Sequence, residues 1–205
     1  EVVALGRHVA VELEGPVGRV VSAVDWGLAE RVAVRVAGRE PLAASYHYER
    51  LTADFDELTA QAEDLVERAT GLRSASGAAR ARVVDRGDWV RANLASFGRL
   101  LRPLTDKMAE RLDDRTGPKA LVGGVSRRAA GVEVGALLGW MATRVLGQYD
   151  LLIIEDEAPE DQDLVYYVGP NVLAIEKRFG FPPREFRLWL ALHEVTHRAQ
   201  FTGVP

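Results

Sequence analysis

The sequence predicts a mostly α protein with a small β-sheet, an α+β fold. Three observations carry this prediction. Apolar residues recur at steps of three and four over long segments before residue 146, which is typical of amphipathic helices. After Asp150 the chain changes to short, β-prone apolar runs, and a proline pair at 182 and 183 then opens a final helix. A length of 205 residues fits a single domain, with residues 1–150 mainly helical and 151–205 holding the sheet and the last helix.

The composition limits the class of protein. The formal net charge of −4 argues against a nucleic-acid partner, and no run reaches the 18 or so apolar residues of a membrane span. The absence of cysteine excludes a disulfide framework and a thiolate metal site, and is consistent with a cytoplasmic location. The excess of 23 Arg over 3 Lys indicates a bacterium with a GC-rich genome. Because the chain begins without Met and stops at Pro205, we expect it to be a fragment of a longer protein; its oligomeric state stays open.

The first 71 residues are predicted to contain two helices, and the structure of the segment before them stays open. The valine-rich segment Val2–Val21 could form two short strands or an irregular arm. Asp25 is a candidate N-cap for a helix over Trp26–Val36, which Gly38 ends. Apolar residues at helical spacing predict a second helix over Tyr46–Thr70.

The middle of the chain predicts further helices. The small, polar segment Ser74–Ala79 reads as a loop, and Asp88 as the cap of a helix that breaks near Pro103 and resumes over Leu104–Arg115. Ala120–Leu146 follows as one helix or a pair of helices. Its glycines at four-residue spacing predict a close approach of another helix: these are Gly131, Gly135 and Gly139.

Short strands are expected ahead of the last helix. Leu151–Ile154 and Leu164–Val168 are apolar and β-prone, and Gly169-Pro170-Asn171 reads as a turn into a further strand, Val172–Ile175. We expect Leu164–Ile175 to flank the last helix and to offer a sheet edge to an extended peptide.

The last helix, which is apolar nearly all round and therefore predicted to be buried, carries His193, Glu194 and His197. Imidazoles and a carboxylate in an apolar helix are costly unless something compensates them, and a metal ion would. Residues four apart share a helix face, so His193 and His197 can direct ring nitrogens at one zinc ion. Glu194, rotated by about 100°, can reach a zinc-bound water without binding the ion. This is the H-E-x-x-H pattern, in which the glutamate is the general base.

The pattern predicts a zinc-dependent hydrolase, most simply a metallopeptidase acting on a peptide or protein substrate. Two alternatives remain. The histidines could be satisfied core residues, with Glu194 paired to Arg198 or Arg187. The chain could also be a helical binding or scaffold protein that keeps a structural or vestigial metal site without turnover.

The zinc site is incomplete, because a catalytic zinc usually takes three protein ligands. Gln200 and Gly203 stand where the metzincin extension needs Gly and His, which excludes that subclass. The third ligand would lie beyond Pro205 or come from upstream. The upstream candidates are Glu133, Glu155, Asp156, Glu157, Glu176 and His47. Thr196 and Gln200 could touch substrate or support the ligands, whereas Tyr166 and Tyr167 could supply an oxyanion donor but more simply pack.

Several segments resemble the zincin-like metallopeptidase type 2 family of bacterial proteins. They are Val24–Trp26, Trp89–Asn93, Gly139-Trp140, Arg144–Asp150, Tyr167–Asn171 and His193–Phe201. The resemblance implies a largely helical zincin-like fold in proteins longer than this chain, and it implies that His193 and His197 are zinc ligands and Glu194 the general base. Many members are labelled as associated with deazaflavin coenzyme biosynthesis.

Overall fold

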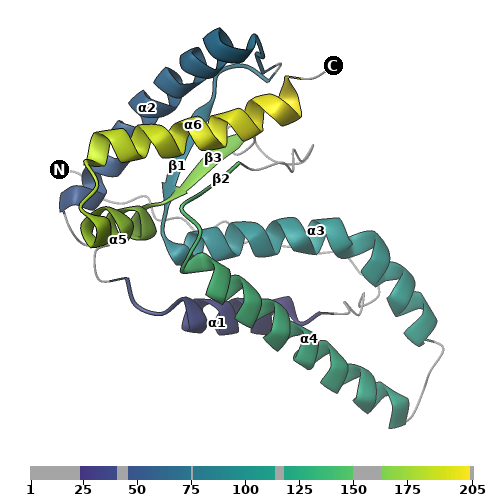
Figure 1. Cartoon of the computed structure of the whole chain (residues 1–205). Coiled ribbons are helices and arrows are strands. Elements are labelled where there is room, and N and C mark those ends of the chain that lie inside the picture. Colours follow the sequence, from purple (N-terminus) through teal and green to yellow (C-terminus); the bar gives the residue numbers. More distant parts are fainter. Residues whose placement is uncertain (1–23, 41–45, 75, 114–117, 150–162, 204–205) are drawn as a thin grey trace, which may run out of the picture.

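The computed structural model describes residues 24–40, 46–74, 76–113, 118–149 and 163–203. It is mostly helical with a small sheet, which confirms the predicted fold class (Figure 1). The elements are α1 (Trp26–Ala37), α2 (Tyr46–Thr70), β1 (Arg80–Val84), α3 (Arg86–Asp113), α4 (Pro118–Ala142), β2 (Gly147–Tyr149), β3 (Leu164–Val168), α5 (Gly169–Phe179) and α6 (Pro183–Thr202). The expected strands in Val2–Val21 and Leu151–Ile154 lie outside the described residues.

The three strands form one sheet in the order β1-β3-β2. β1 runs parallel to β3, with Arg80 opposite Leu164, and β2 runs antiparallel to β3, with Gln148 opposite Tyr166. All five residues of the central strand β3 are buried, because helices cover both faces of the sheet.

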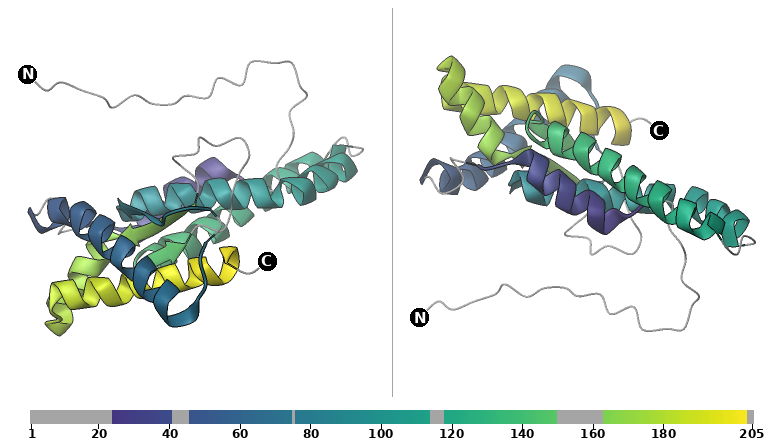
Figure 2. Two further views of the ribbon diagram at one scale, coloured as in Figure 1. Left: turned by 90° about the horizontal axis from the view of Figure 1, so that it is seen from above. Right: turned by 90° about the horizontal axis from the view of Figure 1, so that it is seen from below.

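Side chains of β3 alternate between two cores. Val165 and Tyr167 join the core made with α2, α5 and α6, and Leu164, Tyr166 and Val168 join the core made with α1, α3 and α4. The protein therefore has three layers, with α2 and α6 side by side on one face of the sheet and the other long helices on the opposite face (Figures 1 and 2). Among the described residues, no helix has the length and apolarity that crossing a bilayer would need.

Small residues bring α1 and α4 together. A Cβ added at Gly135 would lie 2.4 Å from the backbone oxygen of Ala29, and one added at Gly139 would lie 2.4 Å from that of Ala33. Ala29 and Ala33 are fully buried. The two helices can approach this closely only because Gly135 and Gly139 have no side chains. The predicted close approach along the glycine row is therefore confirmed.

Long charged side chains bring α2 and α6 together. Arg198 of α6 donates to Glu63 of α2 at 2.8 Å and to Asp163 at 2.6 Å, and its guanidinium also reaches the backbone oxygen of Gly77. Three turns earlier on the same face, Arg187 is paired with Glu176 of α5 and with Asp54 of α2. These two buried arginines fix which face of α6 points to the sheet.

The predictions for α1 and α2 are confirmed, and those for the following region need correction. Asp25 caps α1, its carboxylate accepting from the Leu28 N–H at 3.0 Å. The strand β1 follows the expected loop and was not predicted. α3 begins at Arg86, where Asp85 and not Asp88 accepts the first free N–H groups. It continues through the exposed Pro103 and changes direction in its second half (Figure 1), so a bend replaces the predicted break.

The prediction that Leu164–Ile175 forms strands is wrong after Val168. Gly169 begins α5, since Pro170 is compatible with a first helical turn. The Asn171 side chain, instead of making a turn, donates to the backbone oxygens of Ala142 and Val145 at 2.8 and 2.7 Å. Two of the three strands also come from the part expected to be mainly helical. The edge strand beside α6 is β2, not β3.

Candidate metal centre

The motif helix α6 has one buried and one exposed face. Buried positions recur along the stripe of Arg187, Ala191, Glu194 and Arg198, which faces the sheet and α2. On the outward side, Trp189 is 56% exposed, so the expectation that this helix is buried nearly all round is wrong. The arginine pairs explain the difference, because they draw one stripe inward and turn the stripe containing the histidines to the surface.

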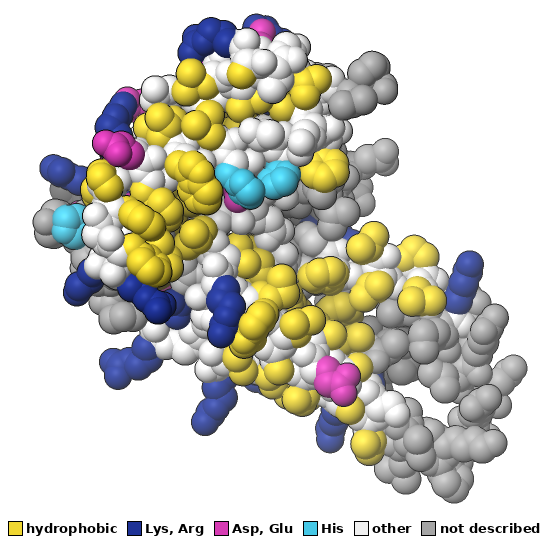
Figure 3. All heavy atoms as spheres, in the orientation of Figure 1, with side chains coloured by type: hydrophobic (Ala, Val, Ile, Leu, Met, Phe, Trp, Pro, Cys, Tyr) yellow, Lys and Arg dark blue, Asp and Glu magenta, His cyan; other side chains and the backbone are white. Residues whose placement is uncertain are grey.

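His193 and His197 converge as their spacing predicts. Their Nε2 atoms are 3.2 Å apart and their rings meet edge to face at 88°. His193 is exposed and His197 half-buried, and Figure 3 shows two histidine side chains side by side on the surface, bordered by hydrophobic side chains. Two nitrogens bound to one tetrahedral zinc at 2.0–2.1 Å would be roughly 3.3–3.4 Å apart, so the pair fits two ligands of such an ion.

Gln200 orients one of these rings. Its Oε1 lies 3.3 Å from His197 Nδ1, one turn further along α6. A donor hydrogen on Nδ1 leaves Nε2 with a free electron pair directed at His193. Thr196, by contrast, donates its hydroxyl to the backbone oxygen of Leu192. Of the two residues expected to support the site, the structure brings only Gln200 to a ligand.

Glu194, the residue after His193, lies on the inward side of α6 against the edge strand β2. Its side chain is 6% exposed and sits against Gly147, where an added Cβ would lie 2.7 Å from Oε1. Burial raises the pKa of the Glu194 carboxyl to about 7, while His197 and a hydrogen bond from the Tyr149 backbone N–H act in the opposite direction. Glu194 therefore lies between His197 and the edge strand β2.

The pairing of Glu194 with an arginine, one of the alternatives, is not found. Arg187 and Arg198 are taken by Asp54, Glu176, Glu63 and Asp163. The histidines are also not core residues, since they lie at the surface. The structure thus removes the interpretation in which the three motif residues only satisfy one another inside the core.

The site also depends on β2, which sequence reasoning did not identify. Gly147 leaves the room that the Glu194 carboxyl occupies, and Tyr149 supplies the N–H. The available signal was a glycine directly after the predicted helix Ala120–Leu146, followed by a short β-prone run, Gln148-Tyr149.

The upstream candidates for a third ligand do not complete the site. Glu176 is paired with Arg187, Glu133 is exposed on α4, and His47 is exposed in the first turn of α2. Glu155, Asp156 and Glu157 lie outside the described residues. Within the parts of the chain that the structure describes, no group of three or more His, Asp or Glu side chains is placed to hold a metal ion.

Tyr166 and Tyr167 pack in the two cores on either side of the sheet, which was the simpler of the two expectations for them. Tyr167 is fully buried, its ring stacks on Phe55 at 3.8 Å and its hydroxyl lies 2.8 Å from Thr59 Oγ1. Tyr166, 8% exposed, belongs to the core on the other side of the sheet. Neither hydroxyl is therefore an oxyanion donor for this site.

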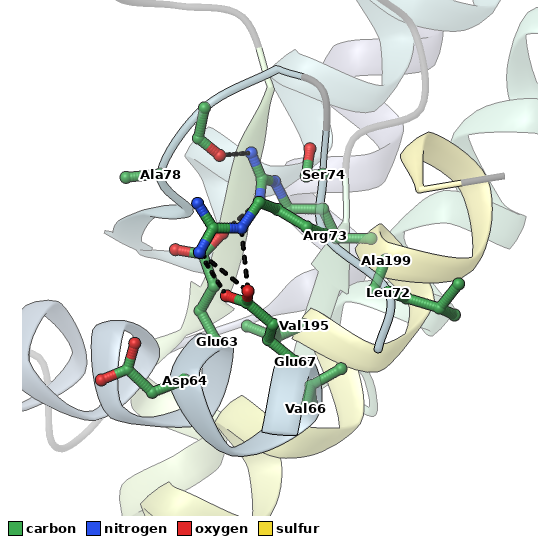
Figure 4. A pocket seen from close by; sticks show the side chains of 12 residues that line it. Glu63, Asp64, Val66, Glu67, Leu72, Arg73, Ser74, Ala78, Val195 and Ala199 are labelled. Carbon is green, nitrogen blue, oxygen red and sulfur yellow. Dashed lines mark hydrogen bonds and ion pairs between the residues drawn. The ribbon is translucent and has the colours of Figure 1, made fainter. Parts of the chain in front are cut away.

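A hollow of about 360 Å³ lies elsewhere, between the end of α2, the following loop and α6 (Figure 4). The α6 residues that line it are Val195, Arg198 and Ala199, of which Val195 and Ala199 are rotated by about 200° from the two histidines. Several charged residues of its lining are paired, as Arg73 is with Glu67 at 2.7 Å and Arg198 with Glu63 at 2.8 Å. The hollow is thus separate from the metal-facing side of the helix.

Comparison with known proteins identifies the family of the chain. The sequence model of the zincin-like metallopeptidase family matches residues 24–205, and the chain belongs to this family. A solved structure from Chloroflexus aurantiacus, described as "a putative hydrolase with a novel fold", has 32% sequence identity and a TM-score of 0.67. The match covers 88% of this chain and 53% of that one, so the chain spans about half the length of its structural relative. No curated protein matches.

Proposed function

We propose that the chain carries the catalytic helix of a zinc-dependent hydrolase that cleaves peptide bonds. The observation that carries the proposal is the convergence of His193 and His197 Nε2 at 3.2 Å, with the buried Glu194 carboxyl beside them. Membership of the zincin-like metallopeptidase family and the similarity to a protein described as a hydrolase support the reaction class.

His193 and His197 would hold the zinc through their Nε2 atoms, together with a third ligand from outside the described residues. When bound, zinc polarises a carbonyl and makes water more acidic. Glu194 is the residue of this chain that moves a proton: it accepts one from the attacking water and returns it to the leaving amine.

The edge strand β2 supports a peptide as the substrate. An extended peptide can add to a sheet edge through backbone hydrogen bonds, and Gly147 of β2 lies directly against Glu194. A peptide placed along this edge would pass the proton-transferring carboxyl. This role replaces the one expected for Leu164–Ile175, whose strand lies in the centre of the sheet.

The rival is a scaffold or binding protein in which the histidine pair holds a structural ion or only shares a proton. A histidine pair with Nε2 atoms 3.2 Å apart can also share one hydrogen. The two functions differ in turnover and in the coordination of the metal, because an enzyme keeps one coordination position open and a structural site is closed by protein.

The proposal is tested in the complete natural protein by metal analysis and by hydrolysis of a library of internally quenched peptides. We expect about one zinc per chain, Glu194→Gln with normal zinc content and activity lowered by about 10²–10⁴-fold, and His193→Ala with neither zinc nor activity. Gln61→Ala, an exposed change on α2, is a control that should alter neither. Full activity of Glu194→Gln would exclude this residue as the base, and wild-type protein without zinc would favour the scaffold.

A further inference from the structure

A row of aromatic rings leads along the surface to the histidine pair. From Phe179 the ring centroids follow at 5.5 Å to Phe181, 5.1 Å to Phe186 and 6.0 Å to Trp189, and Trp189 lies 5.9 Å from His193. Neighbouring rings are tilted by only 14–30°. We call Phe179, Phe181, Phe186 and Trp189 the aromatic row.

The chain builds this row from two helices. Gly180, with a left-handed φ of 65°, ends α5 and turns the chain so that Phe179 and Phe181 lie beside the start of α6. Phe186 and Trp189 precede His193 at steps of seven and four residues, which places them on the outward face of α6. The row and the metal-facing nitrogens therefore belong to one continuous surface.

The row is open to solvent. Phe179 and Trp189 are each 56% exposed and Phe181 is 42% exposed. Figure 3 shows hydrophobic side chains gathered on the face of the molecule that carries the histidine pair. Contiguous apolar patches on a soluble protein usually mark a contact with another molecule.

The spacing along α6 relates the row to the reacting bond. Trp189 is about 6 Å and Phe186 about 10 Å from His193 along the helix axis, at 1.5 Å per residue. An extended peptide advances roughly 3.3 Å per residue, so these rings correspond to positions about two and three residues from the cleaved bond.

We propose that the aromatic row is a specificity subsite, which binds an aromatic or large aliphatic side chain of the peptide two or three residues to one side of the cleaved bond. This inference rests on the proposed peptide hydrolysis. The occupant is identified by continuity: the row reaches the histidine pair by direct ring contact, so whatever is cleaved there passes over it. The two rings nearest the histidine pair, Phe186 and Trp189, select apolar side chains and disfavour charged ones. Arg178 lies over the Phe179 ring, 5.2 Å from its centroid, at the far end of the row.

The test uses internally quenched octapeptides in which Phe, Leu, Ala or Asp is placed at each position in turn, with the complete zinc-loaded protein. We expect kcat/KM to be about tenfold or more higher for Phe or Leu than for Asp at one position two or three residues from the cleaved bond. Trp189→Ala, which removes a ring of the row, and Phe181→Ala, which removes the ring stacked on Phe186 at 5.1 Å, should each remove most of this preference. Phe97→Ala, an equally exposed phenylalanine on α3 at 40%, is the matched control and should keep the preference.

Binding separates this inference from the proposed reaction. In Glu194→Gln, fluorescence anisotropy should show tighter binding of the Phe peptide than of the Asp peptide, and Phe181→Ala should abolish the difference. If the wild type binds peptides selectively but hydrolyses none, the proposed peptidase activity is wrong and the aromatic row is a peptide-binding site only. If peptides are hydrolysed and the sequence preference survives both substitutions, the aromatic row is not the specificity subsite.

Other occupants have their own signatures. If a second copy covers the row, Trp189→Ala will convert a dimer to a monomer in sedimentation and leave peptide preferences intact. If another part of the natural protein covers it, both substitutions will lower the melting temperature without changing preference. If Trp189 only supports His193, its removal will lower zinc content and the rate for all peptides alike, while Phe181→Ala has no effect. Each of these three results would overturn the subsite.

Discussion

The helix pairs α1–α4 and α2–α6 are held together in opposite ways. Glycines of α4 let its backbone touch the backbone of α1, as at Gly135 against the Ala29 oxygen. α6 is held by arginines, Arg187 and Arg198, that reach carboxylates of α2 and of neighbouring segments. Backbone contact fixes a helix by shape alone, whereas long buried side chains fix it by charge. The helix that carries the proposed metal site is therefore oriented by buried ion pairs, which turn Glu194 inward and the histidines outward.

The largest effect is expected where a buried charge loses its partner. Arg198→Met would leave Asp163 and Glu63 without their cation, and we expect the free energy of unfolding to fall by about 3–5 kcal/mol in urea titrations. Arg184 is the matched control, because it joins the same two helices by pairing with Glu57 at 2.6 Å, but in solvent. Arg184→Met should cost far less than Arg198→Met, because water screens this pair. Equal losses would show that α6 is not held by its buried pair.

A smaller loss is expected from steric overlap in the other pair. Gly135→Ala would place a methyl group against the Ala29 backbone, and we expect a loss of about 1–3 kcal/mol of unfolding free energy. Gly124 of the same helix has no neighbouring atom within 4 Å of an added Cβ. Gly124→Ala should therefore stabilise by up to about 1 kcal/mol through helix propensity. A destabilising Gly124→Ala would mean that its surroundings are closed.

The last effect, no larger than that of Gly135→Ala, depends on pH and concerns the motif glutamate in zinc-free protein. Burial raises the folded-state pKa of Glu194 to about 7, so the folded protein holds a proton that the unfolded chain releases above about 4.5. The contribution of this proton to the free energy of unfolding is fully present at low pH and is lost as the pH rises towards 7. Glu194→Gln does not titrate and should be more stable than the wild type by about 1–3 kcal/mol at pH 8, with a smaller difference at pH 4. Thermal unfolding with a chelator across this range measures it, and a pH-independent difference would contradict the burial of the charge.

Local signals were sufficient for elements with clear helix starts and stops. Asp25 and Gly38 bound α1, and Gly71 follows α2, so both helices were predicted within a residue. The short strands and the backbone conformation at the prolines were not predicted from local signals, because both depend on neighbouring segments. β1, for example, is a strand because it pairs with β3. Pro170 is accepted in a first helical turn, and Pro103 lies on an exposed part of α3.

The sequence by itself determined the reactive set and its local geometry. His193, Glu194 and His197 are fixed relative to one another by helical periodicity, a property of the backbone that needs no tertiary contact. The glycine row of α4 likewise predicted a close helix contact without naming the partner.

Only the tertiary structure decided which side of α6 faces solvent. A helix with apolar, basic and histidine residues around its circumference can be docked in several orientations, and the choice depends on partners up to 135 positions away, such as Glu63 for Arg198. The same long-range packing placed Gly147 and Tyr149 against Glu194 and lined up rings from α5 and α6 into the aromatic row. Contacts between residues so far apart depend on how the whole chain packs, which local sequence patterns do not encode.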